Sequence, residues 1–233
     1  MKPAQGNMYN FVSHVWSPVR GWPCPHECEY CYVKRMSERF KYGLGKLRII
    51  SKEFTDLGSG NTIFVCHETD LFAQAIPKYY INWVLEHCKK YPENTYLFQS
   101  KNPARFFEFG LEKWENVILA TTVETDMGIT EYEKISRAPH PLERLKAIIK
   151  IKGKWLITIE PIMKFSPEFA SKIIATNPDM IAIGADSKKC NLYEPLPEEV
   201  RNLIKELKAA KIRIFIKKNL KRLCPELKEG WFS

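Results

Sequence analysis

Three cysteines near the start of the chain have a spacing suited to metal chemistry. Cys24, Cys28 and Cys31 follow the pattern C-x3-C-x2-C. Three thiolates on one short loop can ligate three irons of a cubic 4Fe-4S cluster, since cysteine thiolates are the usual protein ligands of such clusters. The fourth iron is then left without a protein ligand. The spacing therefore predicts a 4Fe-4S cluster with one iron open to a substrate or a cofactor.

Two other interpretations of this loop stay open. Structural zinc needs four ligands and usually shows two C-x2-C pairs, whereas this loop has one pair and a nearby histidine, His26. His26 lies too close in sequence to complete a tetrahedron easily. A four-cysteine cluster would need a distant fourth ligand, for which Cys224, followed by a proline, is the best candidate. The other cysteines lie in apolar contexts typical of buried thiols: Cys66, Cys88 and Cys190.

Length and composition are those of a globular protein. The 233 residues are 45% hydrophobic, which is enough for a sizeable core. We expect a single domain over residues 1–233, with two small domains as the alternative. No apolar run reaches the length of a membrane span, and no leader precedes Met8. We therefore expect a cytoplasmic protein without a membrane partner, in a reducing compartment that suits an oxygen-sensitive cluster.

The chain is basic, with a formal net charge of +9. One group of cations surrounds the cysteine loop: Lys34, Arg35, Arg39, Lys41, Lys46 and Arg48. A second group lies in the last quarter: Lys205, Lys208, Lys211, Arg213, Lys217, Lys218, Lys221, Arg222 and Lys228. Such a surface favours phosphate-rich partners, but a solvated lysine-rich surface is an equally good interpretation.

Short apolar runs alternate with helical patterns. Strands are predicted at residues 10–16, 62–66, 95–99, 116–123, 155–159, 180–183 and 212–216. Helices are predicted at 76–88, from 102, at 142–149, after an N-cap at Ser166, and at 200–207. Apolar strands separated by helices indicate an α/β fold with a mostly parallel sheet. Right-handed crossovers would curl it into a full or partial (β/α) barrel, with an open doubly wound sheet as the alternative.

Polar residues follow each predicted strand, where functional residues of such sheets collect. After the cysteine loop these are His67, Glu68, Thr69 and Asp70; Gln99, Ser100 and Lys101; Thr122, Glu124 and Asp126; Glu160; Gly184, Asp186 and Ser187; Lys217, Lys218 and Asn219. No GxGxxG follows a strand, which disfavours a dinucleotide site.

The cysteine spacing, with Tyr30 just before the third cysteine, resembles the signature of the radical S-adenosylmethionine (SAM) superfamily. The resemblance implies a (β/α) barrel whose 4Fe-4S cluster binds SAM through its open iron. It also implies an electron donor of the flavodoxin or ferredoxin type. An electron from the cluster would then cleave SAM reductively to a 5′-deoxyadenosyl radical, which takes a hydrogen atom from the substrate.

A longer set of stretches resembles a family of small phage- and prokaryote-associated radical SAM-like proteins of unassigned function. These stretches are Trp16-Ser17-Pro18, Tyr30-Cys31-Tyr32, residues 63–72, Ile76-Pro77, Gln99-Ser100-Lys101, Thr122-Val123-Glu124, Glu160-Pro161 and Phe215-Ile216-Lys217. That family looks related to the spore photoproduct lyase group of DNA-repair enzymes. The relation implies repair or modification of DNA or RNA, or action on a nucleotide.

By the same resemblance, several residues would contact SAM. Tyr30 would pack on the adenine, Lys101 would meet the carboxylate, and Thr122 or Glu124 would meet the ribose or methionyl group. Thr69 and Asp70 stand where many radical SAM enzymes have Gly-Gly-Glu. The ammonium contact is therefore open among three acids: Glu68, Asp70 and Glu124. Glu160 is a further candidate for cofactor contacts.

Each of these residues also has a purely structural interpretation. Asp70 could cap a helix, and Lys101 could be a surface lysine. Glu160 could be a buried acid paired with a cation, and Tyr30 and Tyr32 could be core residues.

Three hypotheses for function follow. The first is a radical SAM enzyme acting on nucleic acid or nucleotides, in which Trp16, Trp22 and Phe72 could stack on bases. The second is a radical SAM enzyme acting on a small metabolite or a peptide. The third is a non-catalytic zinc or iron–sulfur module that binds nucleic acid. We also expect a long loop over residues 39–60 at the substrate entrance.

Overall fold

The structure is a computed structural model that describes residues 1–22, 24–40 and 45–232. The main sheet contains, in spatial order, β1 (Lys2–Pro3), β2 (His14–Trp16), β5 (Thr62–Val65), β6 (Thr95–Ser100), β7 (Val117–Thr122), β8 (Trp155–Ile159), β9 (Met180–Ile183), β10 (Arg213–Ile216) and β11 (Gly230–Phe232). A small antiparallel sheet pairs β3 (Val19–Trp22) with β4 (Gly45–Ile49).

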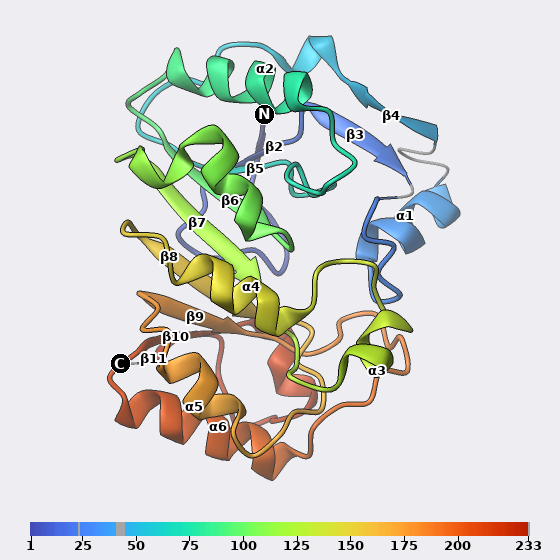
Figure 1. The fold of residues 1–233 in the computed structure, drawn as a ribbon, viewed down its shortest axis with the longest axis vertical. Coiled ribbons are helices and arrows are strands. Elements are labelled where there is room, and N and C mark those ends of the chain that lie inside the picture. Colours follow the sequence, from blue (N-terminus) through green and yellow to red (C-terminus); the bar gives the residue numbers. More distant parts are fainter. Residues whose placement is uncertain (23, 41–44, 233) are drawn as a thin grey trace.

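Helices connect most of these strands (Figure 1). The α-helices are α1 (Tyr32–Phe40), α2 (Lys78–Lys89), α3 (Ile129–Glu133), α4 (Pro141–Ile148), α5 (Phe169–Ile174) and α6 (Pro197–Ala209). The 3-10 helices are η1 (Ser51–Glu53), η2 (Pro103–Phe109), η3 (Leu111–Lys113) and η4 (Lys218–Arg222).

The sheet is mostly parallel. Strands β2, β5, β6, β7, β8, β9 and β10 pair with their neighbours in parallel, while β1 and β11 add antiparallel edges. Within the described residues β1 and β11 remain the two open edges, so the sheet does not close into a full barrel. The predicted α/β architecture with mostly parallel strands is confirmed, and each predicted strand matches an observed one within a few residues.

Apolar side chains cover both faces of the sheet. On β6, Tyr96 and Phe98 pack with the helices on the outer face, where Ile81 and Leu145 belong to the same cluster. Leu97, between them, points to the inner face because strand side chains alternate. There it packs in a second cluster that includes Tyr9, Val12, Ala120, Leu156, Ala182 and Phe215. The segment before β2 therefore fills the concave side of the sheet.

Several local predictions were wrong. Ser166 does not cap α5, because its N–H and hydroxyl both bind the Asp126 carboxylate. The expected loop over residues 39–60 contains β4 and η1, while residues 41–44 lie outside the described part of the chain. Trp16 and Phe72 are each 1% exposed in the core and cannot stack on a base as placed. The side chain of Trp22 lies outside the described residues.

The helices of the described residues are short or carry polar faces. None of their helices combines the length and the apolar character needed to cross a bilayer.

Candidate cofactor site

The cysteine loop follows β3 and is anchored by the segment after α3. The Glu29 N–H donates to the Ile135 carbonyl at 2.9 Å, and the Arg137 N–H donates to the His26 carbonyl at 2.8 Å. Between these two bonds, the Ser136 hydroxyl lies 3.1 Å from the Cys28 sulfur. The loop and α3 accordingly lie on the same side of the molecule, with α1 (Figure 1). The cysteine loop is thus held in place by a segment more than a hundred residues further along the chain.

The three thiols occupy a largely apolar environment. Cys28 is buried, and Cys24 and Cys31 are half-buried. Burial raises the pKa of Cys24 to about 12, and burial likewise raises the pKa of Cys31, with the neighbouring Cys28 adding to both shifts. Thiols in such a place ionise when a metal cation compensates the charge. The chemistry of this donor set fits an iron–sulfur cluster.

The side chains are not arranged as a finished metal site. Among the residues that the structure describes, no group of three or more His, Cys, Asp and Glu side chains could hold a metal ion. His26, the fourth donor considered for zinc, directs its Nε2 to Asp70 at 2.8 Å. Cys224, the candidate distant ligand, is fully buried in the main core, and its thiol approaches the Pro197 carbonyl at 3.6 Å. Cys190, by contrast, packs against the small apolar cluster that contains Cys28 and also borders Cys31.

Asp70 links the cysteine loop to the end of β6. One carboxylate oxygen binds His26 Nε2 and accepts from the Lys101 N–H at 2.7 Å, and the other accepts from the Phe72 N–H at 3.0 Å. Burial alone would raise the pKa of Asp70, but His26 and the hydrogen bond from the Lys101 N–H outweigh it and lower the pKa. Asp70 caps no described helix, since α2 begins only at Lys78. It fastens three loops at the carboxyl end of the sheet.

Glu124, just past β7, is the centre of a buried ionic network. Arg144 donates to its carboxylate at 2.8 Å, the Tyr30 hydroxyl donates to it, and Tyr132 donates at 3.3 Å. The Lys101 ammonium lies 3.6 Å away. Burial alone would raise the pKa of Glu124, but Arg144 and Lys101 outweigh it and lower the pKa to about 2. The carboxylate is therefore ionised and held in one position.

Lys101 is not a surface lysine. Its ammonium lies 5.1 Å from the centre of the Tyr30 ring, in addition to its contact with Glu124. Burial alone would lower the pKa of Lys101, but Cys28 and Glu124 outweigh it and raise the pKa. Lys101 is thus a fixed positive charge next to the cysteine loop. Tyr30 combines core packing with a hydrogen bond to Glu124, while Tyr32 is 36% exposed and donates to the His67 carbonyl.

Glu160, after β8, forms a second polar cluster. Its carboxylate accepts from Asn7 and from Asn219, both at 2.6 Å, and pairs with the Lys217 ammonium. Lys217 is 6% exposed, so it does not belong to the basic surface expected from the sequence. Gly184 passes so close that an added Cβ would lie 2.8 Å from a Glu160 oxygen. In this structure Glu160 is therefore an acid paired with a buried cation, which is the structural interpretation given for it above.

The remaining candidates lie around these clusters. Thr122 is buried and accepts from the Gln99 amide at 3.1 Å. Thr69 is buried and faces the Gly21 carbonyl at 3.5 Å. Glu68 pairs with Arg20 at 3.1 Å. The structure therefore brings together Tyr30, Lys101 and Glu124, joins them to Asp70, and keeps Glu68 and Glu160 in separate contacts.

Sequence reasoning missed Arg144, Tyr132 and Ser136. Arg144 and Tyr132 are each at most 1% exposed, yet an arginine on an amphipathic helix is usually solvated. Ser136 lies in an irregular segment that carries no periodic pattern. No local signal marks these three residues, because each is defined by a contact with a distant part of the chain.

Residues 7–217 match the family described as "Protein of unknown function (DUF5131)". The chain belongs to this family. The matched region contains the three cysteines and the Glu124 network, and it ends just before Asn219. No curated protein matches the chain.

Solved structures of spore photoproduct lyase have a similar fold. One, a double mutant with bound AdoMet and dinucleoside spore photoproduct, aligns with a TM-score of 0.55 and 9% identity, covering 87% of this chain and 63% of that chain. Another, a single mutant, aligns with a TM-score of 0.58 and 8% identity, covering 94% of this chain and 76% of the other. A complex with dinucleoside spore photoproduct aligns with a TM-score of 0.55. The DUF5131 chain thus shares its fold with spore photoproduct lyase, and it spans less than two thirds of the length of the first of these structures.

Proposed function

We propose that this DUF5131 protein is a radical SAM enzyme that acts on nucleic acid or nucleotides. One observation carries the proposal. In a fold similar to that of the spore photoproduct lyases, a C-x3-C-x2-C loop stands at the carboxyl end of the parallel sheet and is tied to Asp70 and Lys101. Active sites of parallel α/β folds form at this end of the strands.

In this proposal Cys24, Cys28 and Cys31 ligate a 4Fe-4S cluster. When bound, the cluster and SAM supply one-electron reductive cleavage of the SAM sulfonium. The Ser136 contact and the two backbone bonds to the segment after α3 keep the cysteine loop in place. Burial and apolar packing around Cys28 limit the access of water.

The polar residues nearby would bind and orient SAM. Lys101 is a fixed cation suited to a carboxylate, and its 3.6 Å separation from Glu124 leaves it free to donate to a ligand. Tyr30, whose ring also contacts the Lys101 ammonium, would pack on the adenine. Thr122, Glu124 and Glu160 offer acceptors for ribose hydroxyls or the ammonium. Asp70, with Thr69 and Glu68, would shape the loop that surrounds the ligand.

The broader expectations belong to the same proposal. Residues 1–233 would form a single domain. The chain would belong to the small phage- and prokaryote-associated group of radical SAM-like proteins. The enzyme would act in the cytoplasm with a flavodoxin- or ferredoxin-type electron donor. The nucleic-acid substrate is supported by the net charge of +9 and by the dinucleoside lesion bound in a structure with a similar fold.

Anaerobic reconstitution with iron and sulfide tests the proposal. The reconstituted protein should hold about four irons, show the absorption and electron paramagnetic resonance spectra of a 4Fe-4S cluster, and release 5′-deoxyadenosine from SAM when reduced. Nucleic acid should raise the yield. Cys28→Ala should lose the cluster, whereas the matched variant Cys224→Ala should keep it. Zinc in place of iron, or full metal content in Cys28→Ala, would contradict the proposal.

A further inference from the structure

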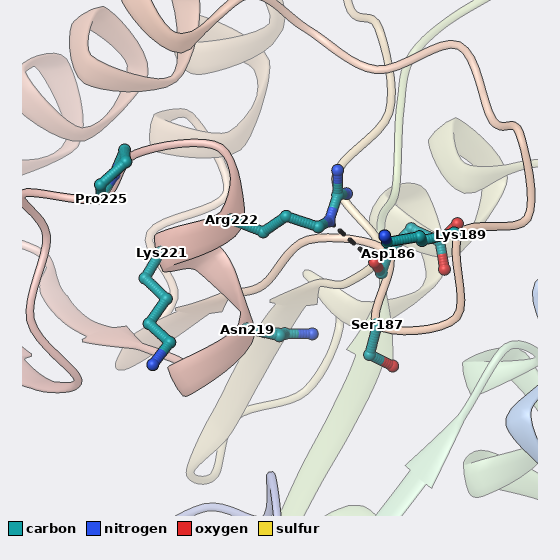
Figure 2. A pocket seen from close by; sticks show the side chains of 7 residues that line it. All are labelled: Asp186, Ser187, Lys189, Asn219, Lys221, Arg222 and Pro225. Carbon is teal, nitrogen blue, oxygen red and sulfur yellow. Dashed lines mark hydrogen bonds between the residues drawn. The ribbon is translucent and has the colours of Figure 1, made fainter.

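A cavity of about 390 Å³ opens beside the Glu160 cluster, beyond the ends of β9 and β10. Asn219, Lys221, Arg222 and Pro225 line it from η4 and the turn after it, and Asp186 and Lys189 line it from the loop after β9 (Figure 2). The volume is within the range typical of small-molecule sites. The cavity is thus large enough for a ligand of nucleotide size.

The wall of this cavity combines apolar stems with cationic heads. Lys189 and Lys221 are exposed, and neither has an ion-pair partner among the residues that the structure describes. Arg222 is already engaged, since it pairs with Glu194 and its Nε donates to the Asp186 carbonyl at 3.1 Å. Lysine stems and a proline ring offer apolar contact, while ammonium groups at the rim attract an anion.

The acidic residue of the cavity is buried and directed at backbone donors. Asp186 is 4% exposed, and its carboxylate accepts from the backbone N–H groups of Lys188 and Cys190. The carboxylate therefore stabilises the turn that presents Lys189. Lys188 and Lys218, both exposed, flank the cavity in the chain. The rim is consequently cationic.

The cavity is physically connected to the candidate cofactor site. Asn219, one of its lining residues, donates to the Glu160 carboxylate at 2.6 Å and to the Ala185 carbonyl at 2.6 Å. On the other side, the Arg35 guanidinium of α1 donates to the carbonyls of Lys188 and Lys189. Helix α1 begins directly after Cys31. Hydrogen bonds from the wall of the cavity therefore link it to Glu160 and to the helix that follows the cysteine loop.

We propose that this cavity is the nucleotide subsite of the substrate, with Lys189 and Lys221 each attracting phosphate from its own side of the rim while the sugar or base packs on the lysine stems and Pro225. This inference rests on the proposed function for its choice of a nucleic-acid or nucleotide substrate. The phosphate belongs either to a free nucleotide or to a strand, and both present the same chemistry to the two lysines.

Binding of nucleotides and a labelled single strand tests this subsite without cluster or SAM. The probe is a fluorescent oligodeoxynucleotide of about 12 nucleotides, measured by anisotropy at several salt concentrations. The variant is Lys189→Gln/Lys221→Gln. The matched control, Lys152→Gln/Lys154→Gln, removes the same charge from exposed lysines that precede β8, at the opposite end of the sheet.

The subsite variant should weaken strand binding by roughly tenfold more than the control and lower the slope of log Kd against log salt by about 1 for each phosphate that the protein no longer binds. Unlabelled dTMP should compete with the strand, while thymidine should not. If dTMP alone binds in a lysine-dependent way, the phosphate comes from free nucleotides, and the subsite stands. If the strand also binds in this way, the phosphate comes from nucleic acid, and the subsite again stands.

Equal losses in the two double variants would overturn the subsite, as would equal competition by thymidine, by inorganic phosphate and by dTMP. Absence of any strand or dTMP binding at low salt would overturn it as well. Because these measurements need neither iron nor SAM, their failure leaves the proposed SAM cleavage untouched. Failure to cleave SAM with intact lysine-dependent binding would remove the proposed enzyme activity alone.

Discussion

His26 Nε2 and the Asp70 carboxylate are 2.8 Å apart, and they connect the cysteine loop to the residues that follow β5. The same carboxylate oxygen accepts from the Lys101 N–H, so one buried acid joins the cysteine loop to the ends of two strands. An irregular loop such as the cysteine loop needs such anchors, because ordering each loop residue costs conformational entropy.

Replacing Asp70 should loosen the cysteine loop. Asp70→Asn keeps the size of the side chain but weakens its bonds to His26 and Lys101, and we expect it to lower the free energy of unfolding by about 1.5–3 kcal/mol. Urea titration measures this loss. The control Glu143→Gln breaks an exposed pair with Lys146 and should leave the free energy of unfolding nearly unchanged. Equal effects of the two variants would mean that Asp70 does not anchor the loop.

Removing the guanidinium of the Glu124 network should be far more costly. Arg144→Met leaves a buried carboxylate without its closest cation, and we expect a loss of about 3–5 kcal/mol in the free energy of unfolding. Arg201→Met breaks an exposed pair with Glu226 and should leave the free energy of unfolding nearly unchanged. Chemical denaturation of both variants compares them directly. A loss below about 1 kcal/mol for Arg144→Met would contradict the network.

Glu124 should make the protein sensitive to acid. Its pKa in the folded state is lowered to about 2, against an ordinary value of 4.5. Its ionised form therefore stabilises the fold fully above pH 4.5, and this contribution is lost as the pH falls from 4.5 toward 2. Glu124→Gln cannot titrate, so its free energy of unfolding should fall less steeply over that window. Parallel curves for the two proteins would show that Glu124 is not stabilised as an anion.

Gly184 should be intolerant of even a methyl group. An added Cβ would lie 2.7 Å from Asn219 Oδ1 and 2.8 Å from Glu160 Oε1. We expect Gly184→Ala to displace Glu160, to lower the free energy of unfolding by about 1–3 kcal/mol and to weaken SAM binding. Gly153→Ala, where a Cβ meets nothing within 4 Å, should be neutral or stabilise by up to about 1 kcal/mol. Thermal unfolding and SAM titration of both variants measure these effects. Similar results for Gly184→Ala and Gly153→Ala would show that position 184 accepts a methyl group.

Much of the fold was predictable from the sequence, because it depends on local patterns. The strand at residues 155–159 is predicted with its observed bounds, since its continuous apolar run suits a strand buried on both faces. The antiparallel edge β11 was missed because it is short and pairs with β10 only through the tertiary fold. The antiparallel pair of β3 and β4 was missed for a similar reason, since the cysteine loop and α1 separate the two strands in the chain.

The parallel α/β class and the presence of three thiols on one loop follow from the order of residues alone, since apolar periodicity and cysteine spacing are local properties of the chain. The folded arrangement was needed to establish that Arg144 neutralises Glu124, that Lys217 is buried against Glu160 and that His26 binds Asp70. Each of these pairs joins residues far apart in sequence. A charged side chain needs an oppositely charged or hydrogen-bonding partner only once folding has buried it, because an unpaired buried charge is costly.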